Sequence, residues 1–142
     1  WDLLIVGPVY DHAYNSNILN KISEYNLEHR VTFTGMLKGE KRVSAYGASS
    51  LFVLPSHTEN FGIAIAEAMA ARLPVITTHG TPWHEIVEFD AGWWVELNQA
   101  NINISLVTAL KMDADQLVGK GNNGFNLISK YDSTRCFINK NM

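Results

Sequence analysis

Two acidic residues eight positions apart carry the strongest chemical signal in the sequence. Glu59 lies in a polar stretch after the apolar run 51–54, and Glu67 is the one polar residue between positions 63 and 71. The alanine-rich segment 62–72 predicts a helix that is apolar on every face and is therefore covered on all sides. A carboxylate there needs a hydrogen-bonding partner, because burying an unpaired charge costs several kcal/mol. We expect both acids to bind a polar ligand.

The start of the predicted helix adds a site for an anion between the two acids. A helix that begins near Gly62 leaves the amides of Phe61, Gly62 and Ile63 without partners in the helix, and such amides bind phosphate. Glu67 then lies ~7.5 Å along the helix axis from Gly62. A ligand with a phosphate in its middle and hydroxyls at both ends, such as a sugar nucleotide, suits this pattern. The same amides are also compatible with an ordinary capped helix start.

The rest of the chain shows alternating strand and helix patterns. Short apolar runs predict strands at 1–6, 31–34, 51–54, 75–78 and 92–95, and helical spacing predicts helices at 16–25, 40–48, 62–72, 83–88, 98–112 and 115–131. This alternation is typical of βαβ units and a parallel sheet. Open α/β sheets bind ligands beyond the carboxyl ends of their strands, which is where we expect Glu59 to lie.

Three local features refine the predicted helices. Asn15 or Ser16 is the expected cap of the first helix. Val43 and Tyr46 are expected to face inward from the second helix. Glycines near the middle of the last helix are expected to interrupt or bend it (Gly119, Gly121 and Gly124).

Length and composition predict one globular domain over residues 1–142. The chain is 46% hydrophobic and 18% charged, which is typical of a soluble protein. It contains no apolar run of about 18 residues and no N-terminal signal segment, so we expect no membrane span and a cytoplasmic location. The net charge of -3 without a basic cluster argues against nucleic acid as a partner. The single cysteine, Cys136, excludes a disulfide framework and is expected to be an unpaired thiol.

The segment from Pro55 to Ile76, PSHTENFGIAIAEAMAARLPVI, resembles the signature of the group 1 retaining glycosyltransferases of the GT-B fold. Their pattern P-S-x-x-E-x-F-G-x-x-x-x-E-A-M-A-x-x-x-P-V-I is matched here at every fixed position. Enzymes of this kind have two Rossmann-like domains, of which the second binds the donor. The resemblance implies that residues 1–142 form part of that second domain, an α/β fold whose parallel sheet is flanked by helices and lacks its first βα unit. It also implies that the acceptor domain is absent from this chain.

The resemblance further implies a reaction and a division of roles. The parent enzyme would transfer a sugar from a nucleotide-sugar donor to an acceptor hydroxyl, with retention at the anomeric carbon, in polysaccharide or glycoconjugate synthesis. Glu59 would be the catalytic residue in contact with the donor sugar, and Glu67 would bind the ribose. The other site residues would bind the donor sugar and diphosphate (Glu59, Asn60, Phe61, Gly62 and Ile63) and the base (Gly35, Met36 and Leu37).

The implied partners are the nucleotide-sugar donor and an acceptor glycan or lipid-linked sugar. The acceptor would bind through the missing domain, which would also hold the protein at the membrane surface. The resemblance implies no metal ion and no other cofactor.

Two parts of the family's architecture are missing from this chain. The family carries an Arg and a Lys before the strand that matches residues 3–6, and both neutralise the donor diphosphate. Without two charge-assisted hydrogen bonds of ~1.5–3 kcal/mol each, donor affinity falls by about two to four decades. The same segment supplies the central strand of the sheet, so we expect a gap in the sheet or an edge with unpaired backbone groups. Such an edge leads to a rearranged sheet or to pairing between chains. We expect no turnover by this chain alone.

Two alternative functions stay open beside the transferase. A GT-B sugar-nucleotide epimerase shares the layout of the fold but not, as a rule, the two acids at this spacing. A non-catalytic interaction module would keep the fold and lose the site. A buried Glu67 argues against the module, because a decayed site has no use for a buried acid.

Histidines and tryptophans near the motif have competing interpretations. Three histidines could bind a metal ion, but we expect hydrogen-bonding or solvated side chains (His57, His79 and His84). Three tryptophans could form a platform for carbohydrate, but we expect core or interface positions (Trp83, Trp93 and Trp94). Trp83 belongs to a stretch that replaces the family's commoner glycine pair.

Overall fold

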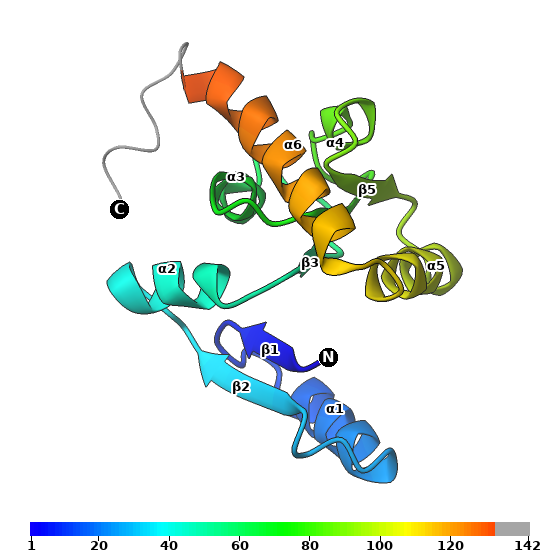
Figure 1. Cartoon of the computed structure of the whole chain (residues 1–142). Helices are drawn as coiled ribbons and strands as arrows, with labels where there is room; N and C mark the ends of the chain where they lie inside the picture. The colour runs from blue at the N-terminus through cyan, green and yellow to red at the C-terminus, as the bar shows by residue number, and fades with distance from the viewer. Residues whose placement is uncertain (133–142) are drawn as a thin grey trace. The chain divides into compact units, whose positions relative to one another are not determined.

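The computed structural model describes residues 1–132 and has an α/β architecture of parallel strands flanked by helices (Figure 1). This confirms the predicted fold class. The chain separates into two compact units, Trp1–Arg42 and Val43–Met142, each with its own parallel sheet. The assignment of residues 1–142 to one domain stays a prediction. Cys136, expected to be an unpaired thiol, lies outside the described residues.

The first unit consists of two parallel strands and the helix that connects them. β1 (Leu3–Val6) pairs with β2 (Val31–Gly35), with Leu3 opposite Val31 and Val6 opposite Gly35. α1 (His12–Glu24) joins the strands, since parallel strands need a long crossover connection.

α1 begins four residues before its predicted start. Asp11 is the N-cap, and its side chain accepts a hydrogen bond from the Tyr14 amide at 2.9 Å. The expected caps, Asn15 and Ser16, lie inside the helix instead, and the Ser16 hydroxyl donates to the His12 carbonyl. The prediction was wrong because Asp, Asn and Ser are all good N-caps, so residue type alone does not choose among neighbouring candidates.

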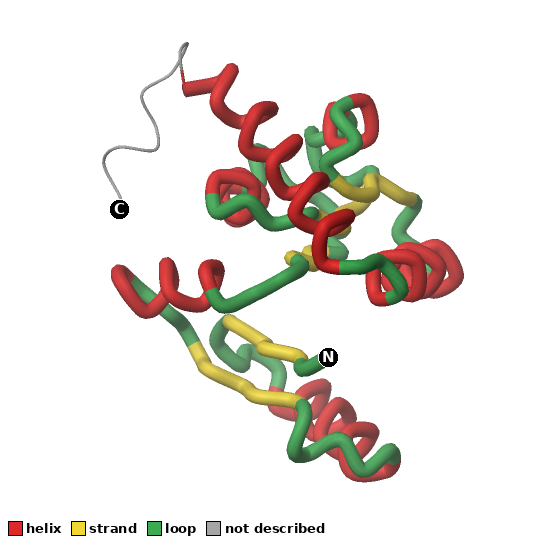
Figure 2. Tube along the Cα trace, in the orientation of Figure 1, coloured by secondary structure: helices red, strands yellow, loops and turns green. Residues whose placement is uncertain are grey.

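The second unit contains a three-stranded parallel sheet and most of the helical residues (Figure 2). Its strands, in the order they pair, are β3 (Phe52–Leu54), β4 (Val75–Thr78) and β5 (Gly92–Val95). Its helices are α2 (Gly39–Gly47, which starts just before the unit), α3 (Ile63–Ala70), α4 (Glu85–Glu88), α5 (Gln99–Leu110) and α6 (Ala114–Asp132). None of the helices within residues 1–132 is long and apolar enough to cross a membrane.

The strands form two sheets rather than one. Within the described residues, β1 pairs only with β2 and β3 pairs only with β4, so each has one edge without a neighbouring strand. The expected gap or rearrangement of the sheet stays a prediction. Pairing between chains at such an edge stays a prediction.

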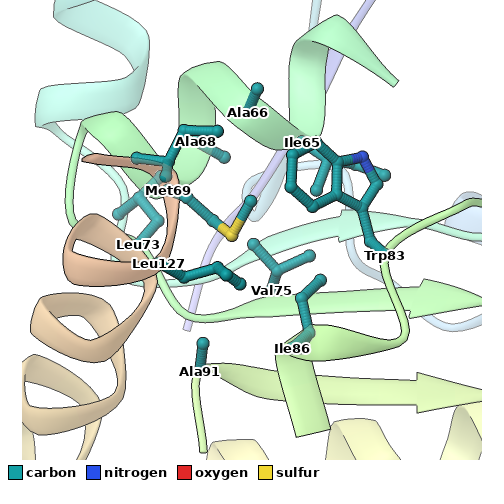
Figure 3. Packing of buried hydrophobic residues seen from close by; sticks show 11 residues of the cluster. Ile65, Ala66, Ala68, Met69, Leu73, Val75, Trp83, Ile86, Ala91 and Leu127 are labelled. Atoms are coloured by element: carbon teal, nitrogen blue, oxygen red, sulfur yellow. The ribbon is translucent and has the colours of Figure 1, made fainter. Parts of the chain in front are cut away.

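The core of the second unit lies between α3, α6 and the sheet. Figure 3 shows Met69 of α3 pointing toward Val75 of β4 and Leu127 of α6, while Trp83 lies near Ile65 at the other end of the cluster. All five side chains are at most 1% exposed. Because burying one such side chain stabilises a fold by ~1.5–3 kcal/mol, this cluster fixes α3 and the residues at its start.

α6 runs without a break, so the predicted interruption at its glycines is wrong. A Cβ on Gly121 would lie 2.7 Å from the carbonyl carbon of Arg72, and a Cβ on Gly124 would lie 3.2 Å from Cγ of Met69. These glycines therefore allow α6 to approach α3 closely. Tertiary packing of this kind outweighs the low helix propensity of glycine.

Two residues that were predicted to be covered are exposed. Ile63 is 66% exposed, so α3 has an open face at its first turn, and Val43 on α2 is 49% exposed. Tyr46, the other residue predicted to face inward from α2, is half-buried. Helical spacing identifies which apolar residues share a face but not whether another element covers that face.

Candidate functional site

The β3–α3 loop (residues 55–62) leaves the carboxyl end of β3 and contains the first of the two acids. Its beginning is held by Ser56, whose amide donates to the Leu54 carbonyl and whose hydroxyl donates to the Thr58 carbonyl, both at 3.0 Å. Glu59 is half-buried and Asn60 is exposed. Glu59 thus lies at the end of a strand where α/β sheets bind ligands, as predicted.

The β4–α4 loop (residues 79–84) supports the β3–α3 loop from the neighbouring strand. The Glu59 amide donates to the Gly80 carbonyl at 2.9 Å, and at the end of β4 the Thr78 hydroxyl donates to the Ser56 carbonyl. A Cβ on Gly80 would lie 2.6 Å from the His57 carbonyl carbon and 2.8 Å from the Ser56 carbonyl oxygen. The two backbones are therefore so close that only glycine fits at position 80.

Gly62 is the N-cap of α3 and has a left-handed backbone, with φ 74° and ψ 58°. Its carbonyl accepts the first helical hydrogen bond, from the Ile65 amide at 2.9 Å. A Cβ here would lie 3.0 Å from Cδ1 of Ile65, 3.1 Å from Nε1 of Trp83 and 3.2 Å from Cγ of Glu59. The Glu59 side chain therefore lies directly against the start of α3.

The amides at the start of α3 have no acceptor in the described part of the chain. This holds for the backbone N–H groups of Phe61, Gly62 and Ile63. Phe61 and Ile63 are also exposed, at 43% and 66%. Gly62 between them is buried. Amides without acceptors next to Glu59 suit an anionic ligand, and the positive end of the helix dipole favours one.

Glu67 lies on α3 and is half-buried. The Tyr46 hydroxyl is 3.1 Å from Oε2 of Glu67 and 3.3 Å from the Ala64 carbonyl oxygen. The Tyr46 ring packs against Phe52, with ring centroids 5.9 Å apart. The hydrogen-bonding partner expected for this acid is therefore Tyr46. The spacing of apolar residues predicted that Tyr46 faces inward from α2, but no pattern in the sequence connects it with Glu67.

Trp83 lies beneath the β3–α3 loop and is 1% exposed. Its indole N–H donates to the Phe61 carbonyl at 2.5 Å, and its ring meets the Phe61 ring edge to face at 5.2 Å between centroids. The Tyr131 ring of α6 packs on it at 5.6 Å. Trp83 is therefore a core residue that contacts the candidate site, a role that its position in the sequence did not reveal.

Trp93 and Trp94 are half-buried in β5. The Trp94 indole N–H donates to the Thr81 carbonyl at 3.0 Å, and Nζ of Lys120 lies 5.1 Å from the centre of the Trp93 ring. These contacts hold both side chains against their own unit, as expected of core residues.

The histidines near the motif contact single side chains. The His79 ring stacks on Trp94 with centroids 4.0 Å apart, and Nε2 of His84 lies 3.8 Å from Oε1 of Glu88. Within residues 1–132 no group of three or more His, Cys, Asp or Glu side chains could hold a metal ion. Independence of metal ions stays a prediction.

The residues predicted to contact the base belong to the first unit. Gly35 is the last residue of β2, with φ 65°, while Met36 is exposed and Leu37 is half-buried. The acids and amides of α3 and its loop belong to the second unit. The part of residues 35–37 in the site stays a prediction.

Comparison with known proteins identifies sequences related to this chain. The family model of glycosyl transferases group 1 matches residues 1–123. Mannosylfructose-phosphate synthase from Agrobacterium fabrum is 39% identical over 82 residues, which are 54% of this chain and 18% of that protein. Lipopolysaccharide core biosynthesis mannosyltransferase LpsB from Rhizobium meliloti is 26% identical over 135 residues, which are 92% of this chain and 38% of that protein. This chain thus spans less than two fifths of the length of either enzyme.

A solved structure shares the fold over almost the whole chain. The C-terminal domain of LpcC, a glycosyl transferase group 1 family protein from Francisella tularensis, matches with a TM-score of 0.78 and 26% identity, covering 97% of this chain and 71% of that one. The signature between Pro55 and Ile76 lies inside the segment that the family model matches. The chain belongs to the glycosyl transferases group 1 family.

Proposed function

We propose that this chain is the donor-binding part of a retaining glycosyltransferase, which transfers a sugar from a nucleotide-sugar to an acceptor hydroxyl in polysaccharide or glycoconjugate synthesis. One observation carries the proposal, namely the arrangement at the start of α3. There the Glu59 side chain lies against Gly62, and the amides of residues 61–63 have no acceptor among residues 1–132. Glu67 lies further along α3, where the Tyr46 hydroxyl of α2 donates a hydrogen bond to it. Two acids on either side of an anion site suit a nucleotide diphosphate linked to a sugar.

Each part of this arrangement has a task in the proposed reaction. Glu67, whose Oε2 lies 3.1 Å from the Tyr46 hydroxyl, accepts hydrogen bonds from the ribose hydroxyls. The amides of residues 61–63 bind the diphosphate and stabilise the charge that develops as it leaves. Glu59, with the neighbouring Asn60, contacts the hydroxyls of the donor sugar. Residues 35–37 contact the base.

Other parts of the proposed reaction lie outside the site described above. The acceptor, a glycan or a lipid-linked sugar, binds through a further domain of the parent protein, at the cytoplasmic side of a membrane. The reaction uses no metal ion, because basic side chains and helix amides neutralise the diphosphate.

Nucleotide binding by the 142-residue chain tests the proposal. We expect ligand-observed NMR to detect weak binding of one of UDP, GDP and ADP, and the nucleotide that binds identifies the base. Glu67→Ala should abolish that binding, because the loss of hydrogen bonds to a charged group weakens binding by about tenfold or more. Glu88→Ala is the matched control, since it removes an exposed acid of the same unit whose nearest basic side chain is His84, 3.8 Å away.

Two results would contradict the proposal. The first is that none of the three nucleotides binds the wild-type chain. The second is that Glu67→Ala stabilises the fold and leaves nucleotide binding unchanged, which is the behaviour expected of a non-catalytic interaction module.

A further inference from the structure

We infer that Trp83 is a positioning residue, which fixes the Phe61–Gly62 peptide so that the amide at the start of α3 faces the donor diphosphate. The inference rests on the proposed function of the same site. Trp83 belongs to the β4–α4 loop, which contains none of the residues proposed to touch the donor. It acts on the donor only through the backbone of the β3–α3 loop.

The hydrogen bond from Trp83 sets the orientation of this peptide. The indole N–H donates to the Phe61 carbonyl at 2.5 Å. No cis peptide bond occurs in the described residues, so the Phe61 carbonyl and the Gly62 N–H point in opposite directions across a planar trans peptide. A carbonyl held toward the indole therefore directs the Gly62 N–H to the opposite side of the peptide, although Gly62 itself is a buried residue.

A second contact shows how closely the indole controls this position. The Cβ of any residue larger than glycine at position 62 would lie 3.1 Å from Nε1 of Trp83 and 3.2 Å from Cγ of Glu59. The indole edge, Gly62 and the Glu59 side chain thus meet at one place. If the peptide rotated, the amide and the acid proposed to bind the donor would both move.

Trp83 is itself held firmly enough to act as a fixed support. It is 1% exposed and belongs to the core cluster with Ile65 and Ile86 (Figure 3). Tyr131 packs on its ring, and the Tyr131 hydroxyl donates to Oε2 of Glu85 on α4. The indole therefore cannot follow the β3–α3 loop if that loop shifts.

The test compares two variants that each lose one indole N–H. Trp83→Phe removes the hydrogen bond to the Phe61 carbonyl, and Trp94→Phe removes a similar bond, at 3.0 Å, to the Thr81 carbonyl. Each chain is titrated with the nucleoside diphosphate that binds the wild type among UDP, GDP and ADP, and with the corresponding monophosphate. We expect Trp83→Phe to weaken diphosphate binding at least fivefold, about the worth of one hydrogen bond. Monophosphate binding should change less than twofold, and Trp94→Phe should bind both ligands like the wild type.

The inference is overturned if Trp83→Phe binds the diphosphate as the wild type does. It is also overturned if Trp83→Phe weakens monophosphate and diphosphate equally, because that is the pattern of general loosening. If the wild-type chain binds none of the three nucleotides, the proposed function is wrong and the inference fails with it, so the two failures are distinguishable. Should Trp83→Phe not fold, replacing the indole of Trp83 by benzothiophene removes the N–H with little change of shape, and the same outcomes apply.

Discussion

The β3–α3 loop and the β4–α4 loop lie side by side at the carboxyl ends of adjacent strands, yet they differ in how they contribute to the site. The first loop carries residues whose chemistry suits a ligand, among them Glu59 and the amides before α3. The second contains none of the residues proposed to touch the ligand, but its Gly80 and Trp83 contact the first loop directly. The proposal of a ligand thus rests on the chemistry of the first loop, whereas the support for the candidate site depends on backbone contacts and one indole N–H.

Mutations can measure how much free energy the contacts between the two loops contribute to the stability of the fold. Three hydrogen bonds join the β3–α3 loop to the end of β4 and the β4–α4 loop, from Glu59 to Gly80, from Thr78 to Ser56 and from Trp83 to Phe61. At about 1 kcal/mol each they contribute roughly 3 kcal/mol. That is a large share of the ~5–15 kcal/mol by which a domain of this size is stable.

Gly80→Ala should have the largest effect of the changes considered. The new Cβ would lie 2.6 Å from the His57 carbonyl carbon, so the two loops would have to separate. We expect the free energy of unfolding to fall by about 3 kcal/mol, as for overpacking in a close-packed region. Urea denaturation measures this change.

Gly119→Ala is the control for that experiment. Gly119 lies on α6, and a Cβ on it would meet no neighbouring atom within 4 Å, so alanine there should stabilise the helix by about 0.5–1 kcal/mol. If Gly80→Ala were as stable as the wild type, the contact between the loops would not support the site.

The sequence allowed most elements to be predicted, together with the position of Glu59 beyond the end of β3. The strands at 75–78 and 92–95 are confirmed at both ends, because short apolar runs bounded by turn residues define them clearly. Glu67 was expected to need a partner, and Tyr46 is that partner. The alternation of strands and helices was enough to predict the parallel pairing.

The features that could not be predicted from the sequence depend on contacts between residues far apart in the chain. The continuity of α6 follows from the approach of Gly121 to Arg72, 49 positions away (121 − 72), which no local pattern reports. The exposure of Ile63 depends on what other elements leave uncovered. Trp83 was recognised as a core candidate, but its bond to the Phe61 carbonyl could not be predicted because a backbone acceptor has no signature in the sequence.

Gly62→Ala should have an intermediate effect on stability, and it tests the contact between the two loops by a change in the first loop. Alanine at φ 74° costs about 1–2 kcal/mol, and its Cβ would also crowd Trp83 and Glu59. We expect the second unit to lose more than 2 kcal/mol of stability, at the upper end of the ~1–3 kcal/mol typical of strained positions, together with its nucleotide binding.

Gly39→Ala is the control for this change, because Gly39 has φ 53° and open space around it, so it reports the backbone cost alone. Native-state amide hydrogen exchange measures the free energy of unfolding of each unit separately. Equal losses for the two variants would mean that Trp83 and Glu59 do not restrict position 62.

Tyr131→Phe should have the smallest effect and shows how far the support of the second loop extends. The hydrogen bond to Glu85, with burial and the charge of that acid as smaller causes, raises the pKa of Tyr131 to about 12. A phenol with a higher pKa in the folded chain stabilises the fold fully below the unfolded value of 10.0, and this contribution is lost as the pH rises toward 12. Because the Tyr131 side chain is 37% exposed, solvent screening limits the contribution to about 1 kcal/mol or less.

Urea denaturation from about pH 8 upward should therefore show the wild type losing its advantage in stability over Tyr131→Phe above about pH 10. A difference that stays constant with pH would mean that the bond to Glu85 does not hold α6 against α4.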